Sequence, residues 1–185
     1  MRTQAWKGLI GLLLIFIALN SFAAIEKIAF PGDEGFDLVW WPKVKTPDGY
    51  VVDDKVSHSN AVKMFVLKGK DFADSESVIY AKADYKPRLP HIKSLDEFVR
   101  SDLREFHENS ADISIHDRES LSDGDGKHLV TKVFTSVHDG YWECVAYGEE
   151  GDYFLIFTVS AKSNAGLNSA LPVFKKMIRQ YHEKQ

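Results

Sequence analysis

Cysteine is almost missing from this sequence, because Cys144 is the only one among 185 residues. A single cysteine cannot close an internal disulfide bond, although exported proteins often carry such bonds. The sequence also has no internal repeat and no low-complexity tract. The fold therefore depends on a hydrophobic core, and a chain of this length can bury one without disulfides.

The sequence also lacks an excess of positive charge. The formal net charge is −4, with 23 basic and 27 acidic residues. No basic helix and no alternation of aromatic and basic residues stands out against this acidic background. A mildly acidic domain has no general attraction for nucleic acid, so we expect no nucleic-acid partner.

The histidines lack the spacing of a metal site. No H-x-x-x-H or H-E-x-x-H pair places two of them on one helical face. The seven are His58, His91, His107, His116, His128, His138 and His182. His138 is interpreted as a solvated turn residue, and a metal would require scattered histidines to converge in the fold. We expect neither a metal nor a cofactor.

The segment SDGDGKH, residues 122–128, has the carboxylates of a calcium loop but not its spacing. A calcium-binding EF-hand loop that began at Asp123 would need an oxygen ligand at its fifth position and glutamate at its twelfth. Lys127 and Phe134 occupy those positions. We therefore interpret the segment as a hairpin turn, in which aspartate and glycine tolerate the tight backbone.

The amino terminus has the layout of a secretory signal peptide. Arg2 and Lys7 precede a short apolar run, and small residues follow it. Ser21 and Ala23 suit signal peptidase, which predicts cleavage after Ala23 and one globular domain over residues 24–185. Cleavage would change the formal net charge from −4 to −6. The alternative is an uncleaved membrane anchor, but the run reaches about 20 residues only by including polar ones.

The remaining sequence predicts an α+β domain, an antiparallel sheet with helices packed on it. Strands are expected at 36–41, 60–69, 77–85, 112–121, 128–137, 141–148 and 153–161, and the last three are joined by short turns as a meander. The strand at 153–161 is apolar on both faces, which is typical of a central strand.

Two helices are expected to cover the sheet. Ser94 and Glu97 form a capping box at the start of a helix over 94–108. A second helix is expected near 168–183, with an apolar stripe along one face. Pro172 fits only the first turn of a helix, so this helix is predicted to begin between Asn168 and Leu171.

Two segments carry a resemblance to a known group of domains. The first is FPGDEGFDLVWWP (30–42), which resembles the usual first part of PsbP/Mog1/DcrB domains, a Pro/Gly turn before a Gly-Phe strand that ends in proline. The second is YFLIFTVSAKSNAGLNSALPVFKKMIRQY (153–181), which resembles their usual last part, a buried strand, a loop of small residues and a helix. The resemblance lies in element order and apolar pattern over most of the chain after residue 23, and it implies an α/β/α sandwich. Its members are mostly non-catalytic accessory subunits, adaptors and envelope proteins. No functional motif matches, so no site residue is carried over.

Cys144 lies in GYWECVAYG, the segment that most resembles a reactive site. On a strand, Trp142, Cys144 and Ala146 share one face, which predicts a buried thiol with a raised pKa. We interpret Cys144 as core filling. The alternatives are a disulfide to another protein and a catalytic nucleophile.

Two segments are candidates for binding. In LVWWPK, Trp40 and Trp41 must point to opposite faces, so that one could lie at the surface or under a loop. In YKPRLPHIK, a loop stiffened by proline gathers Tyr85, Lys86, Arg88 and His91, and rigid loops lose little entropy on docking. The alternative is a connector between a strand and the helix at 94–108.

Three functions remain open from the sequence. The first is an exported, non-enzymatic binding or accessory protein that acts through contacts with a partner protein. The second is a periplasmic immunity or inhibitor protein that blocks a toxin or hydrolase, since an acidic surface suits a basic target. The third is an enzyme whose acidic residues and histidines converge only in the fold, and a deep pocket with converging titratable groups would favour it.

Overall fold

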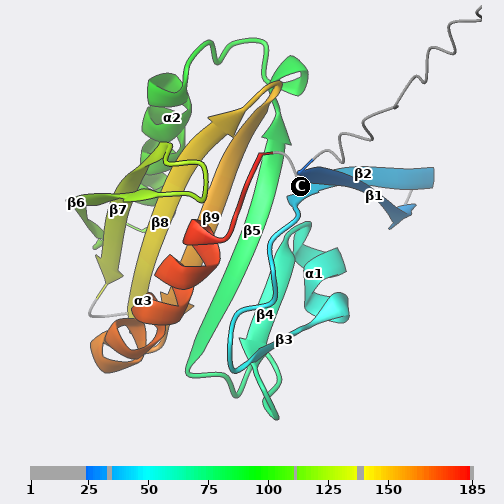
Figure 1. The fold of residues 1–185 in the computed structure, drawn as a ribbon. Coiled ribbons are helices and arrows are strands. Elements are labelled where there is room, and N and C mark those ends of the chain that lie inside the picture. The colour runs from blue at the N-terminus through cyan, green and yellow to red at the C-terminus, as the bar shows by residue number, and fades with distance from the viewer. Residues whose placement is uncertain (1–23, 33–34, 111, 137–139, 184–185) are drawn as a thin grey trace, which may run out of the picture.

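The structure is a computed structural model that describes residues 24–32, 35–110, 112–136 and 140–183. Its elements are β1 (Ile25–Gly32), β2 (Gly35–Pro42), β3 (Tyr50–Val52), α1 (Asp54–Asn60), β4 (Lys63–Leu67), β5 (Ser77–Tyr85), a 3₁₀ turn η1 (Lys86–Arg88), α2 (Leu95–Asn109), β6 (Ser114–Ser122), β7 (His128–Ser136), β8 (Tyr141–Glu150), β9 (Tyr153–Ala161) and α3 (Asn164–Arg179). Nine strands of this described part form one antiparallel sheet, which confirms the predicted α+β class (Figure 1).

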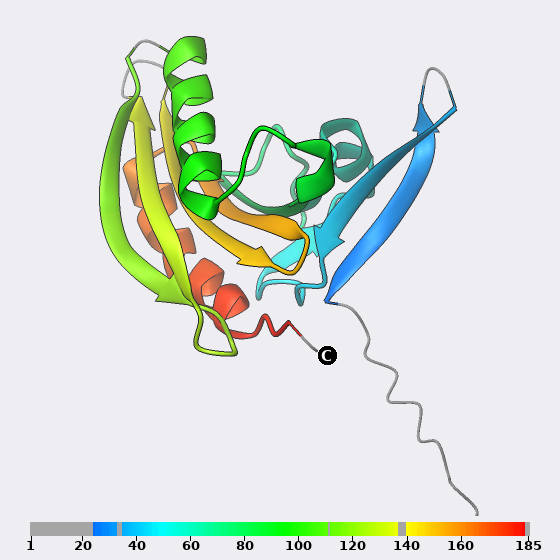
Figure 2. The same cartoon turned by 90° about the horizontal axis from the view of Figure 1, so that it is seen from above.

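The sheet runs in the order β1-β2-β5-β9-β8-β7-β6, so β9 is central as predicted. Figure 2 shows α3 on one face of the sheet and α1 and α2 on the other. Leu155, Phe157 and Val159 of β9 belong to the core cluster under α3. Phe154 and Ile156 belong to the cluster under α2. Each face of β9 therefore helps to form a separate core.

Helix α2 begins at the predicted place, with one change in its cap. The side chain of Ser94 accepts a hydrogen bond from the backbone amide of Glu97. The Glu97 carboxylate accepts from the amide of Lys93, at 2.6 Å, rather than from that of Ser94. The predicted return hydrogen bond of the capping box is therefore made to Lys93, one residue before Ser94 in the sequence. Phe98, with its neighbours on the helix, then packs on the sheet.

Helix α3 corrects the prediction, because it begins at Asn164 and holds Pro172 in its interior. Ser163 caps the helix by accepting from the amide of Gly166, at 2.9 Å, and this cap sets the earlier start. Proline removes the hydrogen bond that its amide would make to the carbonyl of Asn168. Pro172 and Asn168 both lie on the exposed face of α3, where water can reach that carbonyl. A proline is therefore tolerated on this side of the helix.

Three elements were not predicted from the sequence. Strand β1 holds Pro31 and ends at Gly32, and β3 is only three residues long. Helix α1 has seven mostly polar residues, too few for an apolar stripe. It is instead specified by its cap, in which the side chain of Asp53 accepts from the amide of Val56 at 3.0 Å.

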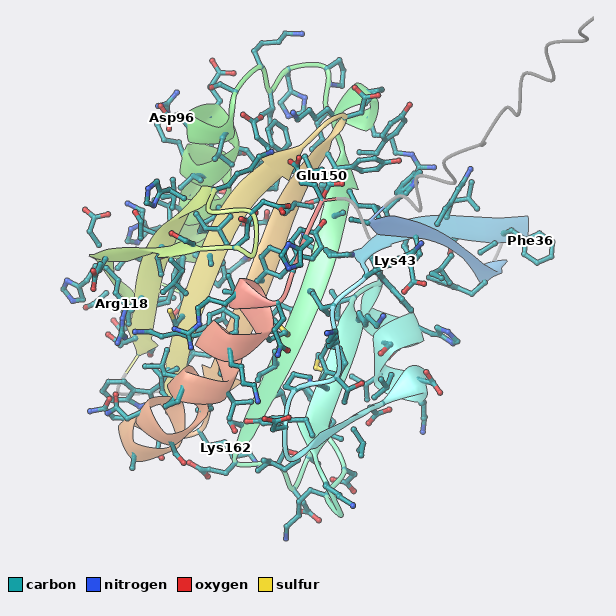
Figure 3. All side chains as sticks on the ribbon, in the orientation of Figure 1. Phe36, Lys43, Asp96, Arg118, Glu150 and Lys162 are labelled. Atoms are coloured by element: carbon teal, nitrogen blue, oxygen red, sulfur yellow. The ribbon has the colours of Figure 1, made fainter. Side chains whose placement is uncertain are left out.

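Strands β1 and β2 form a hairpin arm that projects from the sheet. The two strands pair along their whole length, but the backbone of β2 pairs with β5 only at Trp40 and Ala83. On the same edge of β5, residues Val78 to Ala81 pair with β4. Phe36 lies near the tip of the arm with 76% of its surface exposed (Figure 3).

Cys144 is buried in the core under α3, as predicted. Its thiol is free and fully inaccessible, and Trp142 and Ala146 belong to the same cluster. Burial raises the pKa of the thiol to about 11. The thiolate needed for nucleophilic attack is therefore scarce at neutral pH.

We expect Cys144→Ala to lower the free energy of unfolding by about 1 kcal/mol, at the low end for truncation in a core. A thiol reagent should label the native protein slowly and the protein in denaturant quickly, because only unfolding exposes the sulfur. Mass spectrometry of the labelled protein at successive times measures both rates. Fast labelling under native conditions would contradict the burial of Cys144.

Two predictions fall outside the described residues. The signal peptide at 1–23 and the turn residue His138 are not among them. None of the described helices is both long enough and apolar enough to span a membrane.

Candidate functional site

The structure brings together three of the six residues proposed for binding. The ring of Trp40 stacks on that of Tyr85, with 5.2 Å between centroids. The guanidinium of Arg88 lies over the Trp40 ring, 4.5 Å from its centroid. Arg88 also donates to the carbonyl of Leu38, at 3.2 Å. This bond lies where β2 leaves β5, so Arg88 supports the base of the hairpin arm.

Lys86 also supports the fold. Its ammonium lies 2.9 Å from Oε2 of Glu149 and donates to the carbonyl of Gly151, at 2.8 Å. It also lies 5.0 Å from the centroid of the Phe154 ring. Lys86 therefore links the end of β5 to the turn between β8 and β9, and much of its charge is already paired within the protein.

The other two proposed residues lie elsewhere. Trp41 points to the opposite face from Trp40, as predicted, and is buried against His58 of α1 with ring centroids 6.1 Å apart. His91 is exposed and lines a separate hollow beside α2. The six residues therefore do not form one surface.

We expect Arg88→Ser to lower the free energy of unfolding by about 1 kcal/mol, because it removes a cation–π contact and a hydrogen bond at the base of the arm. Urea unfolding measures the change. Lys70→Ser, in an exposed turn, is the matched control and should change stability by less than about 0.5 kcal/mol. If both variants are equally stable, Arg88 does not stabilise the base of the arm and is a free surface charge.

A second site lies on the sheet face that carries α1 and α2, and it was not predicted. A cleft of about 440 Å³ opens there over β5, β9 and β8. Its polar lining consists of Asn60, Tyr80, Lys82, Asp102, Tyr141, Glu143, Thr158 and Ser160. Its apolar lining consists of Val62, Met64, Phe72, Val78, Phe106, Val145 and Ile156.

Strand register explains why these residues meet. Across the three central strands, Val78 pairs with Ser160 and Ser160 with Glu143. In the next row that points to the same face, Tyr80 pairs with Thr158, which in turn pairs with Val145. Side chains two residues apart on a strand share a face, so both rows project into the cleft.

Glu143 is the least expected residue in this lining. Only 2% of its surface is exposed, and its Oε2 accepts a hydrogen bond from the Tyr80 hydroxyl at 3.2 Å. Its Oε1 has no hydrogen-bond partner among the described residues, and neither has Oγ1 of Thr158. Burial raises the pKa of Glu143 to about 7, although the Tyr80 hydroxyl that donates to Oε2 and the nearby hydroxyls of Tyr141 and Ser160 favour the ionised form.

Asp102 brings a second carboxylate to the cleft from α2. The hydroxyl of Tyr147 donates to its Oδ2 at 2.5 Å, which ties α2 to β8. Burial raises the pKa of Asp102, while this hydrogen bond and the charge of Lys82 oppose the rise. The ammonium of Lys82 lies 3.2 Å from Oδ2 of Asp84. The cleft thus carries two acidic groups, and its one lysine is already paired.

This arrangement has two chemical uses. A buried carboxylate with a free acceptor oxygen can bind a hydrogen-bond donor or a cation. A glutamate with a pKa near 7 can also give or take a proton at neutral pH. Apolar walls with a few polar groups are the usual composition of a ligand pocket.

The sequence contains a signal for this site. On β8, Glu143 alternates with Val145 and Tyr147 on one face, while Cys144 lies on the other. A carboxylate inside a strand that is apolar on both faces is unusual and points to a buried acid.

Of the two carboxylates in the 122–128 segment, that of Asp123 serves the turn, as predicted, whereas that of Asp125 accepts from the amide of Glu183 at 2.7 Å and holds the C-terminal segment. Oδ1 of Asp123 accepts from the backbone amides of Asp125 and Lys127, each at 2.9 Å. Over the described ranges, no group of three or more His, Cys, Asp or Glu side chains could hold a metal ion.

Comparisons with known proteins show similarity of fold. No protein-family model and no curated protein sequence matches this chain. One similar structure is the crystal structure of a Pseudomonas aeruginosa protein of unknown function, which is named as a candidate regulator. Its sequence identity to this chain is 13% and its TM-score is 0.50, and the match covers 84% of this chain and 96% of that protein. The solution structure of PsbP from the cyanobacterium Synechocystis matches at 12% identity with a TM-score of 0.48 and covers 97% and 98%. A PsbP is thus among the similar structures, while Mog1 and DcrB stay predictions.

Proposed function

We propose that the protein is an exported, non-enzymatic accessory protein, and that it binds a partner protein through the cleft beside Glu143. The observation that carries this proposal is the free acceptor oxygen of the buried Glu143 in a mostly apolar cleft. Leaving a buried carboxylate oxygen unsatisfied is costly in a folded protein. A bound group that donates to this oxygen would recover that cost, so the cleft suits a binding role.

An enzymatic role is the second candidate, and one observation favours it. The cleft brings together Glu143, Asp102 and Tyr80, and the pKa of Glu143 is raised to about 7. Converging titratable groups of this kind are typical of general acid–base catalysis. No reaction follows from these groups alone, and the resemblance to accessory domains favours binding.

Partner capture tests the binding role. Val78 points into the cleft from β5, so Val78→Trp would fill the cleft, while Val51→Trp places the same ring on the exposed β3. Tagged protein from the native host should recover the same partner with the wild type and Val51→Trp but not with Val78→Trp. Recovery by all three would contradict binding through the cleft. Turnover of a recovered compound that stops in Glu143→Gln would favour the enzyme.

Export is tested separately. The full chain should be recovered from the envelope or medium as a protein that begins at Ala24, because Ser21 and Ala23 precede the predicted cut. Intact-mass measurement distinguishes this product from the uncut chain. A mass that retains residues 1–23 would contradict cleavage.

A further inference from the structure

The position of Glu143 limits what the cleft can recognise. One carboxylate oxygen accepts from the Tyr80 hydroxyl, and the other is buried with no hydrogen-bond partner among the described residues. A planar guanidinium binds a carboxylate best through both oxygens at once. An ammonium group needs only one oxygen and can direct its other donors elsewhere. The free oxygen of Glu143 therefore favours an ammonium group.

A second acceptor lies close by in the sheet. Oγ1 of Thr158 is buried and has no hydrogen-bond partner among the described residues. Thr158 neighbours Glu143 diagonally, since it pairs with Val145 and Ser160 pairs with Glu143. Diagonal neighbours on one face lie about 7 to 8 Å apart at the backbone, within reach of one small group held between their side chains.

The rest of the cleft suits an unbranched apolar chain. Val78, Val145 and Ile156 lie on the strands beneath it, and Met64 and Phe106 line it from β4 and α2. Contact with such walls removes apolar surface from water, which stabilises a bound hydrocarbon chain. A charged head beside Glu143 with an alkyl chain along these walls would match both halves of the cleft.

We propose that the Glu143 cleft binds a primary alkylammonium group, with the ammonium donating to Oε1 of Glu143 and the alkyl chain lying on the apolar walls. This proposal rests on the binding role proposed above and deepens it. The same chemistry is found in a free alkylamine and in a lysine side chain of a partner protein, and the experiment separates these two sources.

The charged and titratable groups around Glu143 agree with this assignment. Asp102 adds a negative charge from α2, while Tyr80 and Tyr141 contribute hydroxyls from β5 and β8. Lys82 is the cation in the lining, and its ammonium lies against Asp84. From α1, Asn60 lines the cleft and carries no charge. The field in the cleft therefore favours a cation.

Calorimetric titration tests the proposal with protein purified from cells that express the full chain. The probes are n-hexylamine, hexan-1-ol and Nα-acetyl-lysine methylamide, at pH 8 and at pH 5. At pH 8 the amines are protonated and Glu143 is mostly ionised. We expect at least one amine to bind at pH 8, hexanol to bind at least about tenfold more weakly, and amine affinity to fall about tenfold at pH 5, because a charged hydrogen bond is lost.

Variants assign the effect to one carboxylate. Glu143→Gln should weaken amine binding about tenfold or more, whereas Glu119→Gln, on the exposed surface of β6, should leave it unchanged. If Glu143→Gln does not fold, the comparison of pH 8 with pH 5 in the wild type tests whether the ionised carboxylates of the cleft, Glu143 and Asp102, bind the amine. Absence of binding by both amines, or equal binding of hexanol and hexylamine, would overturn the proposal.

The two amine probes separate the sources. If hexylamine binds and the lysine amide does not, the ligand of the cleft is a free amine. If the lysine amide binds, the ligand is a lysine side chain of a partner protein. If Val78→Trp abolishes partner capture while no amine binds, the binding role stands and the ammonium assignment fails. If capture survives Val78→Trp while amines bind at Glu143, the partner does not use the cleft.

Discussion

Glu143→Gln is expected to change how the stability of the protein depends on pH. The pKa of Glu143 is raised from 4.5 to about 7 by burial. Between these two values the folded protein holds a proton that the unfolded chain has released. The free energy of unfolding therefore falls as pH rises through this window and is level again above it. Over the whole window the loss amounts to about 3 kcal/mol.

Glutamine has the shape of protonated glutamate but does not titrate. The variant should match the wild type in stability near pH 4 and exceed it by about 3 kcal/mol at pH 8. Urea unfolding at several pH values measures both curves. The raised pKa values of Asp102 and Glu150 act in the same direction. That of Glu150 is common to both proteins and cancels in the difference, whereas the charge of Asp102 interacts with that of Glu143, so this interaction is part of the measured difference. Parallel curves would show that Glu143 does not titrate in this range.

Phe157→Ala is expected to lower the free energy of unfolding by about 3 to 5 kcal/mol, the range for phenylalanine truncated in a core. Phe157 is fully buried on β9, and its ring lies 5.3 Å from that of Tyr181. Its partners across the sheet are Ala81 on β5 and Ala146 on β8. Two alanines cannot move to fill the space that a lost ring leaves, so the cavity should persist.

Phe36→Ala is the matched control for this truncation. Phe36 belongs to the hairpin arm and is 76% exposed, so its loss should change stability by less than about 0.5 kcal/mol. Urea unfolding under identical conditions measures both variants. A loss below about 1 kcal/mol for Phe157→Ala would mean that the core under α3 can close around the missing ring.

The sequence predicted those parts of the fold that have a regular hydrophobic pattern. The alternation of apolar and polar residues and the density of apolar residues predicted β5 and β7 to β9. A serine cap with an apolar stripe predicted α2. Strands β1 and β3 were missed because their pairing depends on contacts that no local pattern contains, and α1 was missed because its seven mostly polar residues form no apolar stripe. The predicted start of α3 was too late because proline was expected only in the first turn of a helix. In the fold, Pro172 lies on the exposed face of α3, where proline is tolerated in the interior.

The candidate site was harder to predict, for a physical reason. A cleft depends on which residues of different strands share a face and a row, and this follows from register rather than from composition. The opposite orientations of Trp40 and Trp41 were predicted correctly, because they lie on one strand. The meeting of Glu143 with Tyr80 joins two strands that are 63 positions apart in sequence, so only the sheet order places them together.

The short backbone pairing between the β1–β2 hairpin arm and β5 has a consequence for hydrogen exchange. Because the backbone of the arm pairs with β5 only at Trp40 and Ala83, its internal hydrogen bonds can open while β5 and β9 stay paired. Such local opening costs less free energy than global unfolding. Amide protons of β1 and the outer half of β2 should exchange with deuterated solvent well before those of β9. The arm and the central sheet are thus expected to behave as two units of different local stability within one continuous sheet.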